Sequence, residues 1–132
     1  MIRHIALVLG VSMAAPAAFA QTAEAPEGAA VDSAATYEAA RNQLGILKYC
    51  QEQGFSGGEA VEAQARLVGM IPEGDAAAGD SAEQRGTEGV ISIGDTQIPL
   101  AEAVEGQGST VETTCREIET AVNEVAASLP QG

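Results

Sequence analysis

The sequence predicts a small, mainly α-helical domain: a bundle of about four to five helices with one short β-hairpin, closed by one disulfide. Three observations predict this fold. In the two longest segments, apolar residues recur at steps of three or four, which is the spacing of one helical face. Glycine, proline and helix-capping residues interrupt the chain between the segments. Each of the two apolar stripes carries one cysteine, Cys50 or Cys115.

Residues 1–20 have the pattern of a cleavable export signal. A short basic start is followed by an apolar run over 5–15, and residues 18–20 (Ala-Phe-Ala) supply the small-x-small end. A membrane anchor is the alternative, but this run is shorter than the about 20 residues that a helix needs to cross a bilayer. We therefore expect an exported protein, periplasmic or extracellular, whose mature chain begins at Gln21.

The mature chain is strongly acidic. All 19 acidic residues lie after position 20, and loss of Arg3 with the signal makes the mature chain more negative than the −13 of the full sequence. A polyanion repels nucleic acid and anionic lipid, so we expect no nucleic-acid partner. A well-solvated surface is the simplest account of the charge. The length suits a single helical domain over 34–129, preceded by a flexible tail over 21–33 that has no apolar period.

Cys50 and Cys115 are the two cysteines of the sequence. In an oxidising export compartment such a pair predicts a disulfide, and two cysteines allow one intramolecular pairing. The bond would close a loop of about 65 residues, for which the chain-entropy estimate is about 4 kcal/mol. Two free thiols, or a bridge between molecules, are the alternatives.

The first predicted helix covers 34–53, and Gly54 suits the left-handed conformation that often ends a helix. The second covers 57–70 and begins with a capping-box pattern, in which Ser56 and Glu59 satisfy amides at the helix start. The apolar stripe of the first helix consists of Tyr37, Ala40, Leu44, Leu47 and Cys50. The inner side of the second consists of Val61, Gln64, Leu67, Val68 and Ile71.

Between the second helix and the last, the sequence predicts a short helix, a β-hairpin and another short helix. Residues 74–86 predict a short Ala-rich helix that Asp75 caps. Residues 90–98 alternate apolar and polar side chains around a Gly-Asp turn, which predicts the β-hairpin. Pro99 suits the first position of a short helix over 100–107.

The last predicted helix covers 111–129 and has the most regular period in the chain. A second capping-box pattern, from Ser109 to Glu112, precedes it. The apolar stripe consists of Val111, Cys115, Ile118, Val122, Val125 and Leu129. Because the cysteines lie on the stripes of the first and last helices, their bond would make these two helices antiparallel or crossed neighbours.

The mature chain offers little catalytic chemistry. The single histidine, His4, belongs to the signal, which excludes imidazole catalysis and histidine-bearing zinc sites. The sequence contains no phosphate-binding loop, dinucleotide fingerprint or haem-attachment motif. Paired carboxylates leave a hydrolase formally open, but such an enzyme also needs a shaped cleft. We expect no enzyme, no catalytic site and no cofactor.

A weak calcium site is one interpretation of Asp75, Asp80 and Glu83, whose oxygens suit that ion. Their spacing does not match the EF-hand loop, and helix capping accounts for Asp75. We therefore expect no metal site.

Arg41 and Lys48 lie seven residues apart, on one face of the first predicted helix. They could receive an acidic partner, but ion pairs with nearby acids are favoured, because residues three or four apart on a helix are neighbours. The nearby acids are Glu38 and Glu52.

Three motifs carry a resemblance to a known family: ARNQLGILKYCQEQGF (40–55), GDAAAGDSAEQRGTEGVIS (74–92) and TTCREIE (113–119). Together they resemble small exported proteins of alphaproteobacterial type, in a pore-forming family of the ESAT (early secreted antigenic target) kind. The resemblance implies an exported, helical, non-enzymatic protein that perturbs membranes. The chain departs from the wider family because it has no Trp-x-Gly turn, so no functional residue can be carried across.

Three functions are compatible with these observations. The first is an exported interaction protein, pore-forming by resemblance, whose stripes meet a protein partner, a second copy or lipid. The second is a periplasmic chaperone of the acid-stress type, in which acid loosens a disulfide-held fold and exposes binding surface. The third is an inert binding or carrier domain whose stripes are fully buried.

Overall fold

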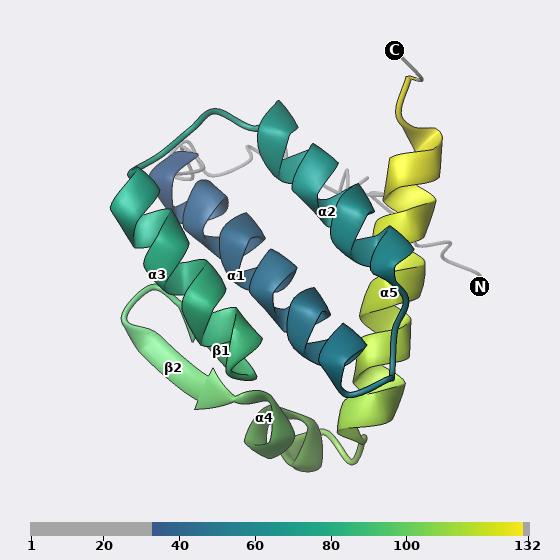
Figure 1. The fold of residues 1–132 in the computed structure, drawn as a ribbon. Helices are drawn as coiled ribbons and strands as arrows, with labels where there is room; N and C mark the ends of the chain where they lie inside the picture. Colours follow the sequence, from purple (N-terminus) through teal and green to yellow (C-terminus); the bar gives the residue numbers. More distant parts are fainter. Residues whose placement is uncertain (1–32, 131–132) are drawn as a thin grey trace, which may run out of the picture.

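The structure, a computed structural model, describes residues 33–130, so the predicted signal (1–20) and most of the predicted tail lie outside the described residues. Within that range it is mainly helical, with five helices, one antiparallel hairpin and a cysteine pair at disulfide distance, which confirms the predicted fold class. The elements (Figure 1) are α1 (Ser33–Glu52), α2 (Gly58–Met70), α3 (Ala76–Thr87), β1 (Val90–Ile93), β2 (Thr96–Pro99), α4 (Leu100–Gly106) and α5 (Val111–Ser128).

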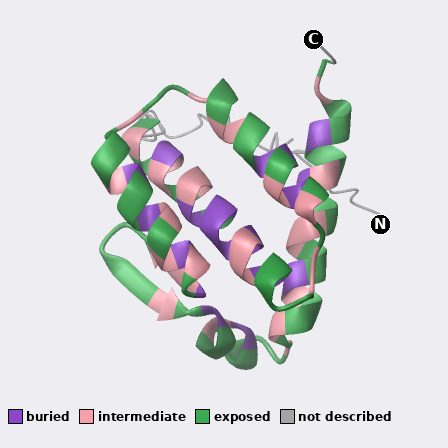
Figure 2. Ribbon diagram, viewed as in Figure 1, coloured by how far each residue is buried: buried purple, intermediate pink, exposed green. Residues whose placement is uncertain are grey.

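Helix α1 lies in the middle of the bundle. In Figure 1, α3 runs along one side of it and α2 along the other, and α5 stands beyond α2. Helix α1 packs most extensively on α3 and also contacts α2, α5 and β1. Figure 2 shows buried residues along much of α1, whereas the outer faces of the surrounding helices are exposed. The single stripe predicted for this helix therefore understates its burial, because Asn42, Gly45 and Ile46 are buried beside it.

Two apolar clusters form the core of the described residues, and α1 contributes to both. The first surrounds the disulfide, and its buried members are Ile46, Cys50, Leu100, Val104 and Cys115. The second joins α1 to α2 and α5, and its buried members are Leu47, Ala60, Ala63, Val122 and Ala126.

Small side chains form the contact between α2 and α5. The buried apolar residues of α2 are Ala60 and Ala63, rather than the larger residues predicted for its inner side, and they pack with Val122 and Ala126 of α5. Of that predicted set, Gln64 is buried, whereas Val61 and Leu67 are partly buried against the cluster.

The predicted stripe of α5 is wrong at one position. Val125 is 49% exposed, and Ala126 is buried in its place. The buried residues of α5 are Cys115, Val122 and Ala126, and the last two pack against α1 and α2. Val125 lies beside this row of residues and faces away from the contact.

The start of α2 differs from the predicted capping box. The N-cap residue is Gly57, and no side chain of its own segment caps it. The N–H of Gly57 instead donates to Glu119 Oε1, 2.8 Å away on α5, while the Ser56 hydroxyl is buried without a hydrogen-bond partner within 33–130. A carboxylate from a distant helix thus binds the N-cap N–H, which is the role that the capping box assigns to Glu59.

The other helix starts lie close to their predicted positions. Asp75 caps α3 as predicted, because its Oδ1 accepts from the N–H of Ala78 at 2.9 Å. The cap of α5 is Thr110 instead of Ser109, since the helix begins at Val111. Pro99 ends β2 and is the N-cap of α4, one position before the predicted one.

The hairpin turns at Gly94 and Asp95, as predicted, and pairs Ile93 with Thr96 and Ile91 with Ile98. Strand β1 contacts both α1 and α3. A two-stranded hairpin has only marginal stability by itself, so its packing on these two helices stabilises it.

Candidate functional site

Two glycines set the contact between α1 and α3. A Cβ atom added to Gly45 would lie 2.1 Å from the carbonyl oxygen of Glu83, and one added to Gly86 would lie 2.3 Å from that of Asn42. No side chain fits at either position, so the two backbones meet directly at this point. The close approach brings the polar side chains of α1 within reach of α3 and the hairpin.

Asn42 is the buried polar residue at this contact, with 4% of its surface exposed. Its Nδ2 donates to the carbonyl oxygens of Ala82 and Val90, both at 2.9 Å. Its Oδ1 accepts from the N–H of Ser92 at 3.1 Å. One side chain thus links α3 to β1 and pairs the backbone groups of Val90 and Ser92, which would be costly to leave unpaired.

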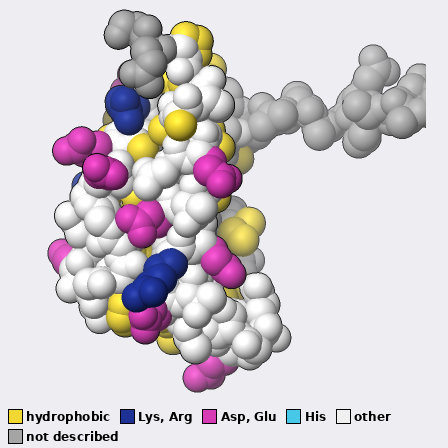
Figure 3. Space-filling view, turned by 90° about the vertical axis from the view of Figure 1, so that its right-hand side faces the viewer, with side chains coloured by type: hydrophobic (Ala, Val, Ile, Leu, Met, Phe, Trp, Pro, Cys, Tyr) yellow, Lys and Arg dark blue, Asp and Glu magenta, His cyan; other side chains and the backbone are white. Residues whose placement is uncertain are grey.

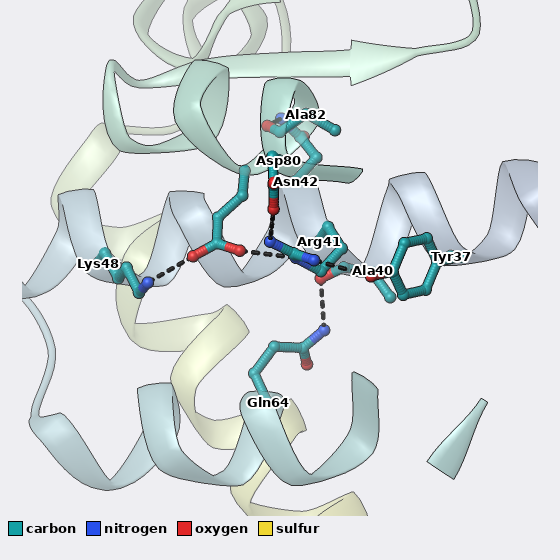
Figure 4. Close-up of polar contacts among 9 residues, drawn as sticks. Tyr37, Ala40, Arg41, Asn42, Lys48, Gln64, Asp80 and Ala82 are labelled. Carbon is teal, nitrogen blue, oxygen red and sulfur yellow. Dashed lines mark hydrogen bonds and ion pairs between the residues drawn. The ribbon is translucent and has the colours of Figure 1, made fainter. Parts of the chain in front are cut away.

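Arg41 and Lys48 form a polar network with α3 (Figure 4). Arg41 donates to Glu83 and Asp80, each at 2.6 Å, and to the Tyr37 hydroxyl at 2.7 Å. Lys48 donates to the second oxygen of Glu83. The predicted pairing with Glu38 and Glu52 is therefore wrong: α3 lies against this face of α1 and supplies the acids.

The network shifts the pKa of two groups. Burial disfavours the charged form of Arg41, but the hydrogen bonds to Asp80, Glu83 and Tyr37 outweigh it and raise its pKa. Burial alone would raise the pKa of Glu83, yet the hydrogen bonds from Lys48 and Arg41 outweigh it and lower that pKa. Arg41 and Glu83 therefore stay ionised at neutral pH, and their ion pair joins α1 to α3.

The acids that we considered as calcium ligands are occupied in other ways. Asp75 caps α3, whereas Asp80 and Glu83 bind Arg41. Among residues 33–130, no group of three or more His, Cys, Asp or Glu side chains is placed to hold a metal ion.

Cys50 and Cys115 form the predicted disulfide, with their Cα atoms 5.6 Å apart. Both residues are fully buried. The bond joins the last turns of α1 to the first turns of α5, so these helices are neighbours as expected.

A groove of about 340 Å³ lies between α1, β1 and α5. A cavity of about 150 Å³ accommodates one benzene ring, so this groove has room for about two side chains of leucine or phenylalanine size. None of its lining residues is charged, in a chain that has 25 charged residues in total. The lining consists of Ala39, Asn42, Gln43, Ile46, Ile91, Ser92, Ile93, Leu100, Thr114, Ile118 and Ala121.

The hairpin forms one wall of this groove and exposes apolar surface there. Ile93 is 69% exposed, the highest fraction among the exposed large apolar residues of 33–130. Next to it, the hydroxyl of Ser92 is buried and has no hydrogen-bond partner in the same range. Both residues also line a second cavity of about 230 Å³, so the groove continues toward the start of α1.

Acidic residues lie beside the groove on α5. Ala121 of the groove wall also lines a shallow hollow that contains Glu117 and Glu124. The arginine of this hollow, Arg116, is bound to Glu112 at 2.6 Å. On the face shown in Figure 3, acidic side chains are likewise scattered over the surface with few Lys or Arg.

The sequence did not identify the groove or the role of Asn42. An asparagine within an otherwise regular helix was the one available signal, since such residues are disfavoured there unless they have a specific partner. No signal in the sequence marked the groove, because its lining comes from four elements, α1, β1, α4 and α5.

No family, curated protein or solved structure matches the chain. The resemblance to the ESAT kind of protein therefore stays a prediction. None of the helices in the described part of the chain is long and apolar enough to cross a membrane.

Proposed function

We propose that the protein is an exported, non-enzymatic binding module that takes an apolar segment of a partner protein into the groove between α1, β1 and α5. The observation that carries this proposal is the lining of the groove, which has no charged residue although the protein is strongly acidic. An uncharged, mainly apolar hollow with a few polar groups is the usual form of a ligand-binding site.

Two further features support a protein segment as the ligand. The groove is partly open to solvent and has room for about two large side chains, as in recognition of a peptide by a few anchor residues. Ile93 lies at the edge of the groove and can pack against the same ligand.

The test is binding of a fluorescein-labelled, uncharged peptide to residues 21–132 with the disulfide formed. The peptide has about 15 residues, with adjacent leucine and phenylalanine residues between serine and glutamine flanks, and binding is followed by fluorescence anisotropy. We expect saturable binding to the wild-type protein. The substitutions Ala39→Gln and Ala121→Gln place longer polar side chains on exposed positions of the groove wall and should weaken it at least about ten-fold.

The matched control is Ala127→Gln, an exposed position on α5 outside the groove. Because alanine and glutamine both favour helix, none of the three changes should unfold the protein. Equal loss of binding in the control, or no binding by the wild-type protein, would contradict the proposal.

Pore formation, which the resemblance implies, is a separate prediction with its own test. The stripe of α5 lies partly in the core and is tied to α1 by the disulfide, so a pore would require these residues to leave the core. Dye release from neutral and anionic vesicles, at neutral pH and near pH 4, decides it. Release that is steep in protein concentration would favour the pore over the groove-binding module, and binding of unfolded clients at low pH would favour the chaperone.

A further inference from the structure

We infer that the segment bound in the groove is amphipathic and carries basic residues at the end that lies over α5. This inference rests on the proposed function and adds the charge of the partner. It follows from the distribution of charge around an uncharged groove.

The two ends of the groove differ in charge. At the α5 end, Ala121 connects the groove to the hollow that contains Glu117 and Glu124. Both glutamates are exposed, and neither makes an ion pair within 33–130. Arg116 is the basic residue of that hollow, and Glu112 neutralises it at 2.6 Å.

The opposite end has no net charge. The cavity that continues the groove toward the start of α1 is lined by one acid, Glu38, and one base, Arg85. An apolar segment with a basic residue at one end therefore matches the whole surface: its apolar part meets the uncharged walls, and its cation meets the two free carboxylates.

Charge also disfavours the other candidates for this surface. A second copy of the chain would bring a net charge of the same sign, and an anionic membrane would do so as well. A basic segment is attracted by the field of the whole protein and by Glu117 and Glu124 in particular. Such attraction mainly increases the rate of association and the selectivity for one partner over another.

The experiment compares three peptides with the same apolar centre, whose flanks are neutral, lysine-bearing or glutamate-bearing. We expect the lysine peptide to bind about three- to ten-fold tighter than the neutral one at low ionic strength, because exposed ion pairs each contribute modestly. The glutamate peptide should bind more weakly than both. Salt should remove most of these differences, since it screens exposed charges.

A double variant tests whether the carboxylates of Glu117 and Glu124 cause the preference for the lysine peptide. Glu117→Gln with Glu124→Gln should abolish the preference for lysine and leave affinity for the neutral peptide unchanged. The matched control is Glu59→Gln with Glu62→Gln, two exposed acids at the contact between α2 and α5, which should keep the preference.

The outcomes separate the two proposals. Equal binding of the lysine and neutral peptides would overturn the charge inference and leave the binding module standing. No binding by any peptide would overturn both. Self-association in sedimentation experiments that Ala121→Gln abolishes would assign the groove to a second copy, and uptake by anionic vesicles that this substitution abolishes would assign it to lipid; either result would overturn the inference.

Discussion

The two sides of α1 are held by different kinds of interaction. Toward α3, two glycines bring the backbones together, and buried or half-buried polar side chains connect the helices. Toward α5, the contacts are apolar, and one disulfide closes them at one end. The first side is specified by shape and hydrogen bonds. The second is specified by burial and a covalent bond, and it includes the groove that our proposal assigns to a ligand.

Removal of the disulfide should have the largest effect. Replacing Cys50 and Cys115 by alanine releases a loop of 65 residues and should lower the free energy of unfolding by about 4 kcal/mol. Urea denaturation measures the loss, and chemical reduction of the wild-type protein should reproduce it. If the variant lost less than about 1 kcal/mol, the apolar side of α1 would not depend on its covalent bond.

A methyl group at the glycine contact should have the next largest effect. Gly45→Ala places a Cβ atom against the backbone of α3 and should cost about 3 kcal/mol, because neither backbone can yield without separating the helices. Gly69→Ala on α2 is the control, since its Cβ would meet nothing within 4 Å. That change should be neutral or stabilise the protein. Thermal unfolding of the two variants tests this, and equal melting temperatures would contradict the close contact between α1 and α3.

Loss of the Asn42 side chain should cost less, about 2 kcal/mol. Asn42→Ala leaves the carbonyl of Val90 and the N–H of Ser92 without this partner, and an unpaired backbone group costs more than the hydrogen bond itself contributes. The neighbouring Gln43 is exposed, so Gln43→Ala is the control. Amide exchange in the hairpin should become faster in the Asn42 variant alone, and unchanged exchange would mean that the hairpin is held by other contacts.

The smallest effect concerns pH. The lowered pKa of Glu83 means that its ionised form stabilises the fold above the ordinary glutamate pKa of about 4.3, and that this contribution is lost as pH falls through the lowered value. Glu83→Gln should therefore destabilise the protein at neutral pH and lose this disadvantage in strong acid. Melting temperatures from pH 7 to pH 2 test this, with Glu62→Gln on the exposed face of α2 as the control. A constant difference between wild type and Glu83→Gln would contradict the assignment.

The features predicted correctly from the sequence are those that repeat along one segment. The stripes of α1 and, apart from Val125, of α5 follow the helical period, and the pairing of Cys50 with Cys115 follows from there being two cysteines. The Asp75 cap is local as well, because donor and acceptor lie three residues apart.

The features that the sequence did not predict depend on which helix lies beside which. Glu83 is 42 residues from Arg41, and Glu119 is 62 residues from Gly57, so no local pattern connects either pair. Local patterns instead favoured Glu38 as the partner of Arg41 and Glu59 as the acceptor at the start of α2, and Glu83 and Glu119 take these roles. The sequence did not predict the groove either, because its lining residues come from four elements that are distant in the sequence.

The hydrogen bond between Gly57 and Glu119 has a consequence for the order in which the protein opens. The first turn of α2 obtains its cap from the middle of α5, so a local opening that moves α5 away also removes the cap from α2. The two helices should therefore exchange their amide protons as one cooperative unit, whereas α1 and α3, joined through their own contacts, should remain protected longer. A ligand that holds α5 in place would then slow exchange in α2, a helix that contributes no residue to the groove wall.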